Sequence, residues 1–166
     1  MKRACFIIPC FLLLACSAQK SVTTATLASD CPKNGTCTTE LIKNRTIVLK
    51  TDEFGQSYYT LEDSANVNVI KFTYDKTVKG DIQDAGYREE IVFEWNPRTK
   101  SLSDVGLQKT KMLFGRFCFC RGQTGYYKIT KGRLTVANKS KKRLLTLQFK
   151  TDEVPQITQK ISISLE

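Results

Sequence analysis

Cysteine is the residue with the most evident chemistry in this chain of 166 residues, which has seven cysteines and no histidine. Without histidine, the chain has no Ser-His-Asp or Cys-His nucleophile, no HExxH zinc-protease motif and no His-ligated copper or iron. An enzyme built from this sequence must therefore use carboxylates, lysine, tyrosine or cysteine.

Four cysteines, Cys31, Cys37, Cys118 and Cys120, remain when the two in the N-terminal export signal and the lipidation candidate Cys16 are set aside, and an even number in an exported protein indicates disulfides. Our first expectation is two disulfides that join the 31–37 segment to the strand of Cys118 and Cys120. The second is a local Cys31–Cys37 bridge beside two reduced or strained cysteines. A four-cysteine zinc site and a catalytic Cys118/Cys120 redox pair remain as alternatives, although C-x-C differs from the usual spacing of both.

Carboxylate pairs give little support for catalysis. Glu90 and Glu94 share one face of a predicted strand about 13 Å apart, which is too far for the paired carboxylates of a glycosidase. Glu89 points to the other face, as a strand-end residue or a buried acid. We therefore expect a non-catalytic protein without a cofactor, and a thiol-redox protein that uses Cys118 and Cys120 is the alternative.

The N-terminus has the pattern of a secretory signal peptide over residues 1–15. A basic start, Met1-Lys2-Arg3, precedes an apolar run from Ala4 to Ala15, which as a helix spans only about 18 Å and is too short to cross a membrane. The sequence Leu13-Leu14-Ala15-Cys16 resembles the lipobox of bacterial lipoproteins. This resemblance implies cleavage before Cys16, diacylglyceryl and further acyl chains on that residue, and a membrane anchor.

Cleavage after Ala18 is the alternative, and it would release a soluble protein. Residues 16–30 are rich in Ser, Thr and Ala and are interpreted as the lipidated cysteine and a flexible tether. By resemblance to Gram-negative lipoprotein sorting, Ser17 implies the outer membrane, on its periplasmic or its surface face. The chain also looks like short β-rich lipoproteins of bacterial cell envelopes, which implies a location and no activity.

Residues 31–166 are predicted to form a single all-β domain, an antiparallel sandwich or small barrel of about eight strands. The apolar runs predict strands at 46–50, 66–74, 89–95, 111–120, 126–130, 133–137, 143–150 and 156–165. Turns at Lys131-Gly132 and at residues 138–141 predict a three-stranded meander over residues 126–150. The 75–87 segment is a predicted loop, and its Asp81 and Asp84 are interpreted as a solvated turn without calcium.

The basic residues are unevenly distributed. No acid lies between Val105 and Thr151, although the formal net charge of the whole chain is +10. A solvated, lysine-rich sheet face is the plain interpretation. The functional one is a surface for an anionic envelope component such as lipopolysaccharide, phospholipid headgroups, an acidic glycan or an acidic protein, and nucleic acid is not expected. Its candidate binding residues are Arg121, Gln123, Tyr126, Tyr127, Lys139, Lys141, Lys142 and Arg143.

Overall fold

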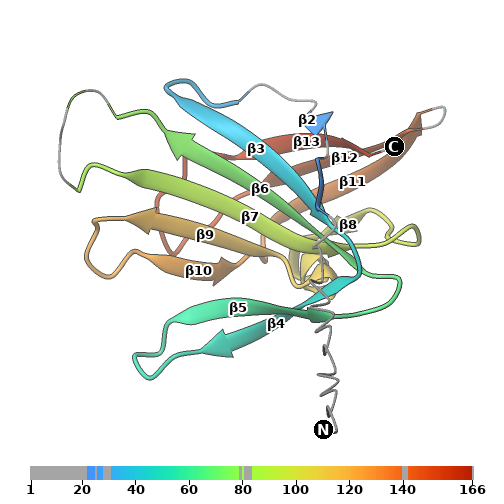
Figure 1. The fold of residues 1–166 in the computed structure, drawn as a ribbon, viewed down its shortest axis with the longest axis horizontal. Helices are drawn as coiled ribbons and strands as arrows, with labels where there is room; N and C mark the ends of the chain where they lie inside the picture. The colour runs from blue at the N-terminus through green and yellow to red at the C-terminus, as the bar shows by residue number, and fades with distance from the viewer. Residues whose placement is uncertain are drawn as a thin grey trace, which may run out of the picture.

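The computed structural model describes residues 22–24, 26–27, 31–78, 80, 84–139 and 142–165. The all-β prediction is confirmed, because these residues form three antiparallel sheets and one short 3-10 helix, η1 (Asp104–Thr110) (Figure 1). The predicted signal peptide, Cys16, Asp81 and Lys141 lie outside the described residues.

Sheet A has six strands in the order β1-β3-β6-β7-β9-β10 and sheet B has five in the order β2-β13-β12-β11-β8. The strands of sheet A are β1 (Val22–Thr24), β3 (Gly35–Ile42), β6 (Asn68–Lys76), β7 (Tyr87–Trp95), β9 (Leu113–Cys118) and β10 (Gly125–Lys128). Those of sheet B are β2 (Thr26–Leu27), β8 (Leu102–Ser103), β11 (Gly132–Lys139), β12 (Lys142–Phe149) and β13 (Lys160–Leu165). The third sheet is the hairpin of β4 (Arg45–Thr51) and β5 (Ser57–Asp63).

Sheets A and B pack face to face, so the fold is a sandwich, and the described strands close no barrel. One apolar cluster joins them, with Ile70, Phe93 and Phe114 from sheet A against Leu147 and Ile163 from sheet B. Alternation of side chains along each strand explains this arrangement, since every second residue points into the space between the sheets.

The β4–β5 hairpin covers part of the outer face of sheet A. Ile47 of β4 packs there against Val69, Val92 and Leu113, which come from three neighbouring strands of the sheet. The outward-facing side chains of sheet A are therefore also buried where the hairpin covers them. The middle of sheet A thus has an apolar layer on each of its two faces.

The predicted meander over residues 126–150 is wrong in one respect. The hairpin of β11 and β12 is present, with Lys139 paired to Lys142, but β10 belongs to sheet A and pairs with β9. The chain crosses from one sheet to the other after Lys128, with Ile129 buried in the core between the sheets. The sequence turn at Lys131-Gly132 is thus a sheet-to-sheet crossing and not a hairpin.

The last predicted strand begins later than expected. β13 starts at Lys160, and the preceding residues form a loop in which Ile157 is exposed and does not share the inner face of Ile161. Five described strands were not predicted. They are the short β1, β2 and β8, and the longer β3 and β5, which pair with β6 and β4. The predicted 75–87 loop corresponds to the segment between β6, which extends to Lys76, and β7, which begins at Tyr87, and part of it lies outside the described residues.

Candidate functional site

A basic groove lies at the end of the sandwich where β7 ends. Its volume is about 600 Å³, and it is formed by the turn after β7 together with β11 and β12. The lining residues are Pro97, Arg98, Thr99, Lys100, Ser101, Val136, Asn138 and Arg143. Three of these are cations and none is an acid, so the groove has the character of a binding site for an anion.

Arg143 holds the two walls of the basic groove together. Its guanidinium donates a hydrogen bond to the backbone carbonyl of Pro97 and lies 5.9 Å from the centre of the Trp95 ring. Arg98 and Lys100 are both exposed at the rim. Arg143 therefore has a structural role as well as a charge, while the other two cations are free to meet a partner.

The structure brings together only part of the predicted binding residues. Lys139 and Lys142 lie at the tip of the β11–β12 hairpin, one register position beyond the Asn138–Arg143 pair of the basic groove. Arg121 and Gln123 lie in the loop between β9 and β10, at the opposite end of sheet A. The cations that the sequence groups together are thus divided between two ends of the molecule.

The two predicted tyrosines are engaged in packing. Tyr126 lies on the outer face of sheet A, where its ring contacts Tyr59 and Phe117 edge-on, and its hydroxyl donates a hydrogen bond of 2.6 Å to Glu90. Burial, followed by this hydrogen bond, raises the pKa of Tyr126 well above its ordinary value. Tyr127 points the other way and packs against the sandwich core.

Arg98 and Lys100 are the residues that sequence reasoning missed. The register shows why they belong to the site: β8, which follows them, pairs with β11 of sheet B, so the turn that contains them is folded against the β11–β12 hairpin. The sequence shows two cations, Arg98 and Lys100, just after a proline, but it does not show which surface they join. The pairing of β8 with β11 is needed to place them beside the β11–β12 hairpin.

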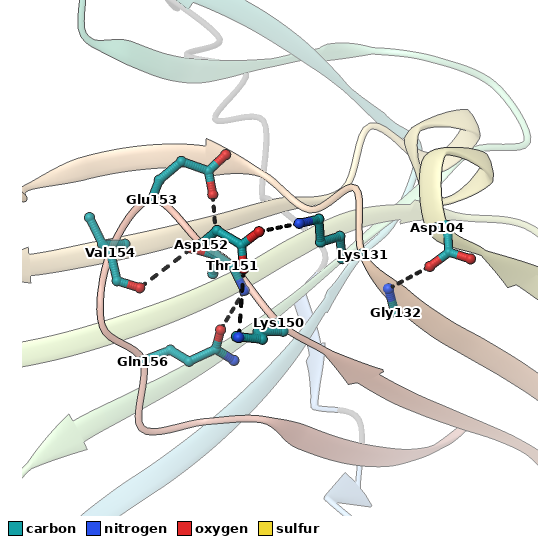
Figure 2. Close-up of polar contacts among 9 residues, drawn as sticks. All are labelled: Asp104, Lys131, Gly132, Lys150, Thr151, Asp152, Glu153, Val154 and Gln156. Carbon is teal, nitrogen blue, oxygen red and sulfur yellow. Dashed lines mark hydrogen bonds and ion pairs between the residues drawn. The ribbon is translucent and has the colours of Figure 1, made fainter.

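A second groove, of about 720 Å³, lies at the other end of sheet B near Phe149. Its cations are partly neutralised, because Asp152 forms ion pairs with both Lys131 and Lys150 (Figure 2). Figure 2 also shows Asp104 accepting a hydrogen bond from the backbone N–H of Gly132. This Phe149 groove is therefore less cationic than the basic groove, although it is larger.

The first expectation for the cysteines is wrong, because both disulfides are local. Cys31 is bonded to Cys37, and Cys118 is bonded to Cys120. Strands β6 and β7 separate Cys37 on β3 from Cys118 on β9, and three strand spacings amount to about 14 Å. A disulfide requires Cα atoms within about 7 Å, so the sheet order excludes a bond between Cys37 and Cys118.

The local Cys31–Cys37 bridge of the second expectation is present. It lies beside the sandwich core, because Cys31 and Cys37 both pack against buried apolar residues. Cys118 and Cys120, which that expectation treats as reduced or strained, form a second bond. The described residues contain no cluster of His, Cys, Asp or Glu side chains that could hold a metal ion.

The sequence left two roles open for Glu89, a strand-end residue or a buried acid, and the structure shows that it is a buried acid. It is 0% exposed, and its carboxylate accepts hydrogen bonds from the Tyr87 hydroxyl at 2.6 Å and from the backbone N–H groups of Ile157 and Thr158 at 2.6 and 2.7 Å. Burial, followed by the hydrogen bond to Glu89, raises the pKa of Tyr87 to about 12. These contacts tie sheet A to the loop before β13.

The other two acids of β7 also have structural partners. Glu90 lies 3.2 Å from the Arg88 guanidinium and accepts the Tyr126 hydroxyl. Glu94 accepts bonds from the Lys111 ammonium and the Ile47 backbone N–H, both at 2.8 Å, and from the Thr46 hydroxyl. Burial alone would raise the pKa of Glu94, but these hydrogen bonds outweigh it and hold the pKa below its ordinary value.

The chain enters the sandwich at the end that carries the basic groove. Val22 of β1 pairs with Ile42, Ile42 with Val69, and Val69 with Glu94, so these four residues form one row across sheet A. The turn of the basic groove begins just beyond Glu94. Strand pairing thus starts within the segment that the sequence predicts as a tether.

No described helix has the length and apolar character needed to span a membrane. Comparison with models of known protein families, with curated proteins and with solved structures finds no match for this chain.

Proposed function

We propose that this chain is a lipid-anchored protein of the bacterial cell envelope, acylated at Cys16, with a β-sandwich whose basic groove binds anionic lipid headgroups without catalysing a reaction on them. The observation that carries the proposal is the acid-free basic groove at the end of the sandwich where the chain enters from Cys16. The partner is the surface of the same membrane that holds the anchor.

The length of chain between the anchor and the first strand supports this orientation. Five residues lie between Cys16 and Val22, and the six residue steps from one to the other reach at most about 22 Å when fully extended. Val22 lies in the same row of sheet A as Glu94, three strand spacings or about 14 Å away. The groove end of the domain is therefore held close to the headgroups.

The binding energy expected from the exposed cations is suited to orienting the domain at the membrane more than to keeping the protein there. A lysine or arginine near an anionic membrane surface contributes about 1 kcal/mol, so the exposed Arg98, Lys100 and Lys139 together contribute about 3 kcal/mol. Several acyl chains on Cys16 already anchor the protein stably. The cations add an electrostatic attraction to the headgroups, which orients the domain so that its groove end faces the lipid.

The acids of β7 support a non-catalytic role. Glu89, Glu90 and Glu94 are each held by structural donors, and they lie on both faces of the sheet instead of converging on one cleft. None of them lines the basic groove. A binding role for the groove requires no group beyond its cations and backbone.

The anchor is tested by mass spectrometry of the protein extracted from membranes. We expect an N-terminus at Cys16 that carries diacylglycerol and a further acyl chain. A soluble protein that begins at Gln19, without lipid, would show that cleavage follows Ala18 and would contradict the anchor.

The groove is tested by sedimentation of the unacylated Cys16→Ser protein with vesicles. We expect binding to phosphatidylglycerol vesicles and not to phosphatidylcholine vesicles, with binding lost near 1 M salt, where the Debye length is about 3 Å. The triple variant Arg98→Ser, Lys100→Ser, Lys139→Ser should lose this binding.

The matched control is Lys50→Ser, Lys76→Ser, Arg121→Ser, which removes the same charge from exposed residues at the opposite end. It should bind nearly as the parent does. Equal loss in both triple variants would show a general charge effect, and stronger binding to a soluble acidic glycan than to vesicles would contradict the membrane assignment.

A further inference from the structure

We propose that the Cys118–Cys120 disulfide is a thiol-exchange site that accepts two electrons from a dithiol in an exported polypeptide. The site lies at the end of the sandwich opposite the basic groove, where β9 ends and the loop to β10 begins. It does not depend on the membrane-binding function proposed above.

The covalent bond has little to add to the stability of its loop. It encloses only Phe119, and disulfide stabilisation through the unfolded chain increases with the length of the closed loop. Other bonds already fix this loop: the Thr124 hydroxyl donates to the Cys118 carbonyl at 2.7 Å, and the Gln123 N–H donates to the Cys120 carbonyl at 3.2 Å. The loop is therefore positioned in the reduced form as well.

The loop is further held from within the sandwich. The Arg116 guanidinium donates to the backbone carbonyl of Gln123 at 3.2 Å and to its side-chain oxygen at 2.9 Å. Arg116 is 7% exposed and belongs to the strand that carries Cys118. The loop is thus attached to a rigid element, which keeps the two sulfur atoms near each other after reduction.

The disulfide lies at the surface, where Cys118 and Cys120 are each half-buried. Phe119, between the two cysteines, is 82% exposed, which is unusual for a large apolar side chain held in a short ring. Beside it is a groove of about 520 Å³ at the ends of β6, β7 and β9, lined in part by Tyr87, Phe117 and Cys118. This Cys118 groove offers an extended polypeptide apolar contact next to Cys118.

Charge near the sulfurs favours the exchange step. Arg116 precedes Cys118 by two residues and shares its face of the strand, and Arg121 directly follows Cys120. Cations stabilise a thiolate, which is the leaving group when a disulfide opens. The Cys118 groove itself is lined by two acids, Asp75 and Asp84, and by two cations, Lys76 and Arg88, so its charges balance.

The reaction is balanced as two exchanges. A substrate thiolate attacks one sulfur of the Cys118–Cys120 bond, that bond breaks, a mixed disulfide forms, and the other cysteine leaves as a thiolate and takes up a proton. The second substrate thiol loses its proton and attacks the mixed disulfide. The substrate becomes a disulfide, and Cys118 and Cys120 become thiols that have received its two electrons.

The other disulfide of the same chain is the internal control. Cys31 and Cys37 are six residues apart, and both pack against the sandwich core. Reduction of this bond releases a longer loop and exposes apolar contacts. It should therefore resist exchange under conditions in which Cys118–Cys120 opens.

The first test is equilibration of the full-length protein in glutathione buffers, followed by alkylation and peptide mass spectrometry. We expect Cys118–Cys120 to be half reduced in a buffer at least about tenfold less reducing than the one that half reduces Cys31–Cys37. The proposal is overturned if the two bonds open together or if Cys31–Cys37 opens first. This test needs no variant.

The second test measures oxidation of a dithiol peptide that contains a phenylalanine between its cysteines. The double variant Cys31→Ser, Cys37→Ser should oxidise the peptide as fast as the parent, and Cys118→Ser, Cys120→Ser should be at least about tenfold slower. Equal rates for the parent and the second variant would overturn the proposal.

Vesicle binding by Cys118→Ser, Cys120→Ser separates this proposal from the membrane function. The basic groove lies at the other end of sheet A, so binding should be unchanged in that variant. Loss of exchange with intact vesicle binding supports the thiol site. Retained exchange with intact vesicle binding contradicts the thiol site and leaves the membrane function standing.

Discussion

The carboxylate of Glu89 accepts a hydrogen bond of 2.7 Å from the backbone N–H of Thr158, and this contact joins the two sheets of the sandwich. Glu89 belongs to β7 in sheet A, and Thr158 lies in the loop before β13 in sheet B. Because the acid is fully buried, its hydrogen bonds replace the water that it loses on folding. Through its hydrogen bonds to Ile157 and Thr158, this side chain holds the 150–159 loop to sheet A.

Replacement of Glu89 with Gln should destabilise the protein by about 1–3 kcal/mol. The amide keeps the size of the side chain, but its NH2 group faces a backbone N–H that has lost its acceptor. Urea unfolding followed by circular dichroism measures the change. The exposed Glu53→Gln should stay within about 0.5 kcal/mol of the parent, and an equal loss in both variants would contradict the role of Glu89.

Acid should release the β4–β5 hairpin before the rest of the fold opens. The folded-state pKa of Glu94 is lowered, so the stabilisation from its bonds to Lys111 and Ile47 is complete above the unfolded pKa of about 4.3. It is lost as the pH falls through the lower folded pKa. Hydrogen exchange in β4 should increase over this range, and in Glu94→Gln exchange should already be faster at neutral pH.

The Glu94→Gln variant also tests whether Glu94 controls the release of the hairpin by acid. Without a titrating group, its exchange in β4 should depend less on pH between neutrality and acid than that of the parent. If the parent and the variant show the same acid dependence, another group controls the hairpin and the assignment to Glu94 is wrong.

Gly132→Ala should destabilise the crossing between the sheets by about 1–3 kcal/mol. Gly132 has a φ of +142°, and a Cβ there would lie 2.3 Å from the Gln148 carbonyl oxygen and 2.7 Å from the Phe149 Cα. Thermal unfolding measures the effect. Gly86→Ala is the control, since a Cβ at that position meets no atom within 4 Å, and equal melting temperatures for the two variants would contradict the steric argument.

The pattern of apolar residues and the turn residues in the sequence predict much of this fold. The alternation in β12 and the apolar run in β7 both predict strands that the structure confirms. The strand β3 was missed because its Gly35-Thr36-Cys37 start follows a turn sequence and has few apolar residues. Its position inside sheet A depends on pairing with β6, which is a long-range contact that a local pattern does not contain.

The site was less predictable than the fold. Sequence reasoning found the cations of the β11–β12 hairpin but joined them with Arg121, which the sheet order places at the other end. It missed Arg98 because the short strand β8 brings its turn to the hairpin. The disulfide expectation failed for the same reason, since only the order of strands shows that β6 and β7 separate the two cysteine pairs.

The most direct test of the membrane-facing orientation uses Trp95, the single tryptophan of the chain, which lies beside Arg143 at the groove end. The acylated protein is reconstituted in vesicles that contain a headgroup spin-labelled lipid, and quenching of Trp95 fluorescence is measured. We predict stronger quenching in phosphatidylglycerol than in phosphatidylcholine vesicles, reversed by high salt and by the Arg98, Lys100 and Lys139 triple variant. Equal quenching in both lipids would contradict the account.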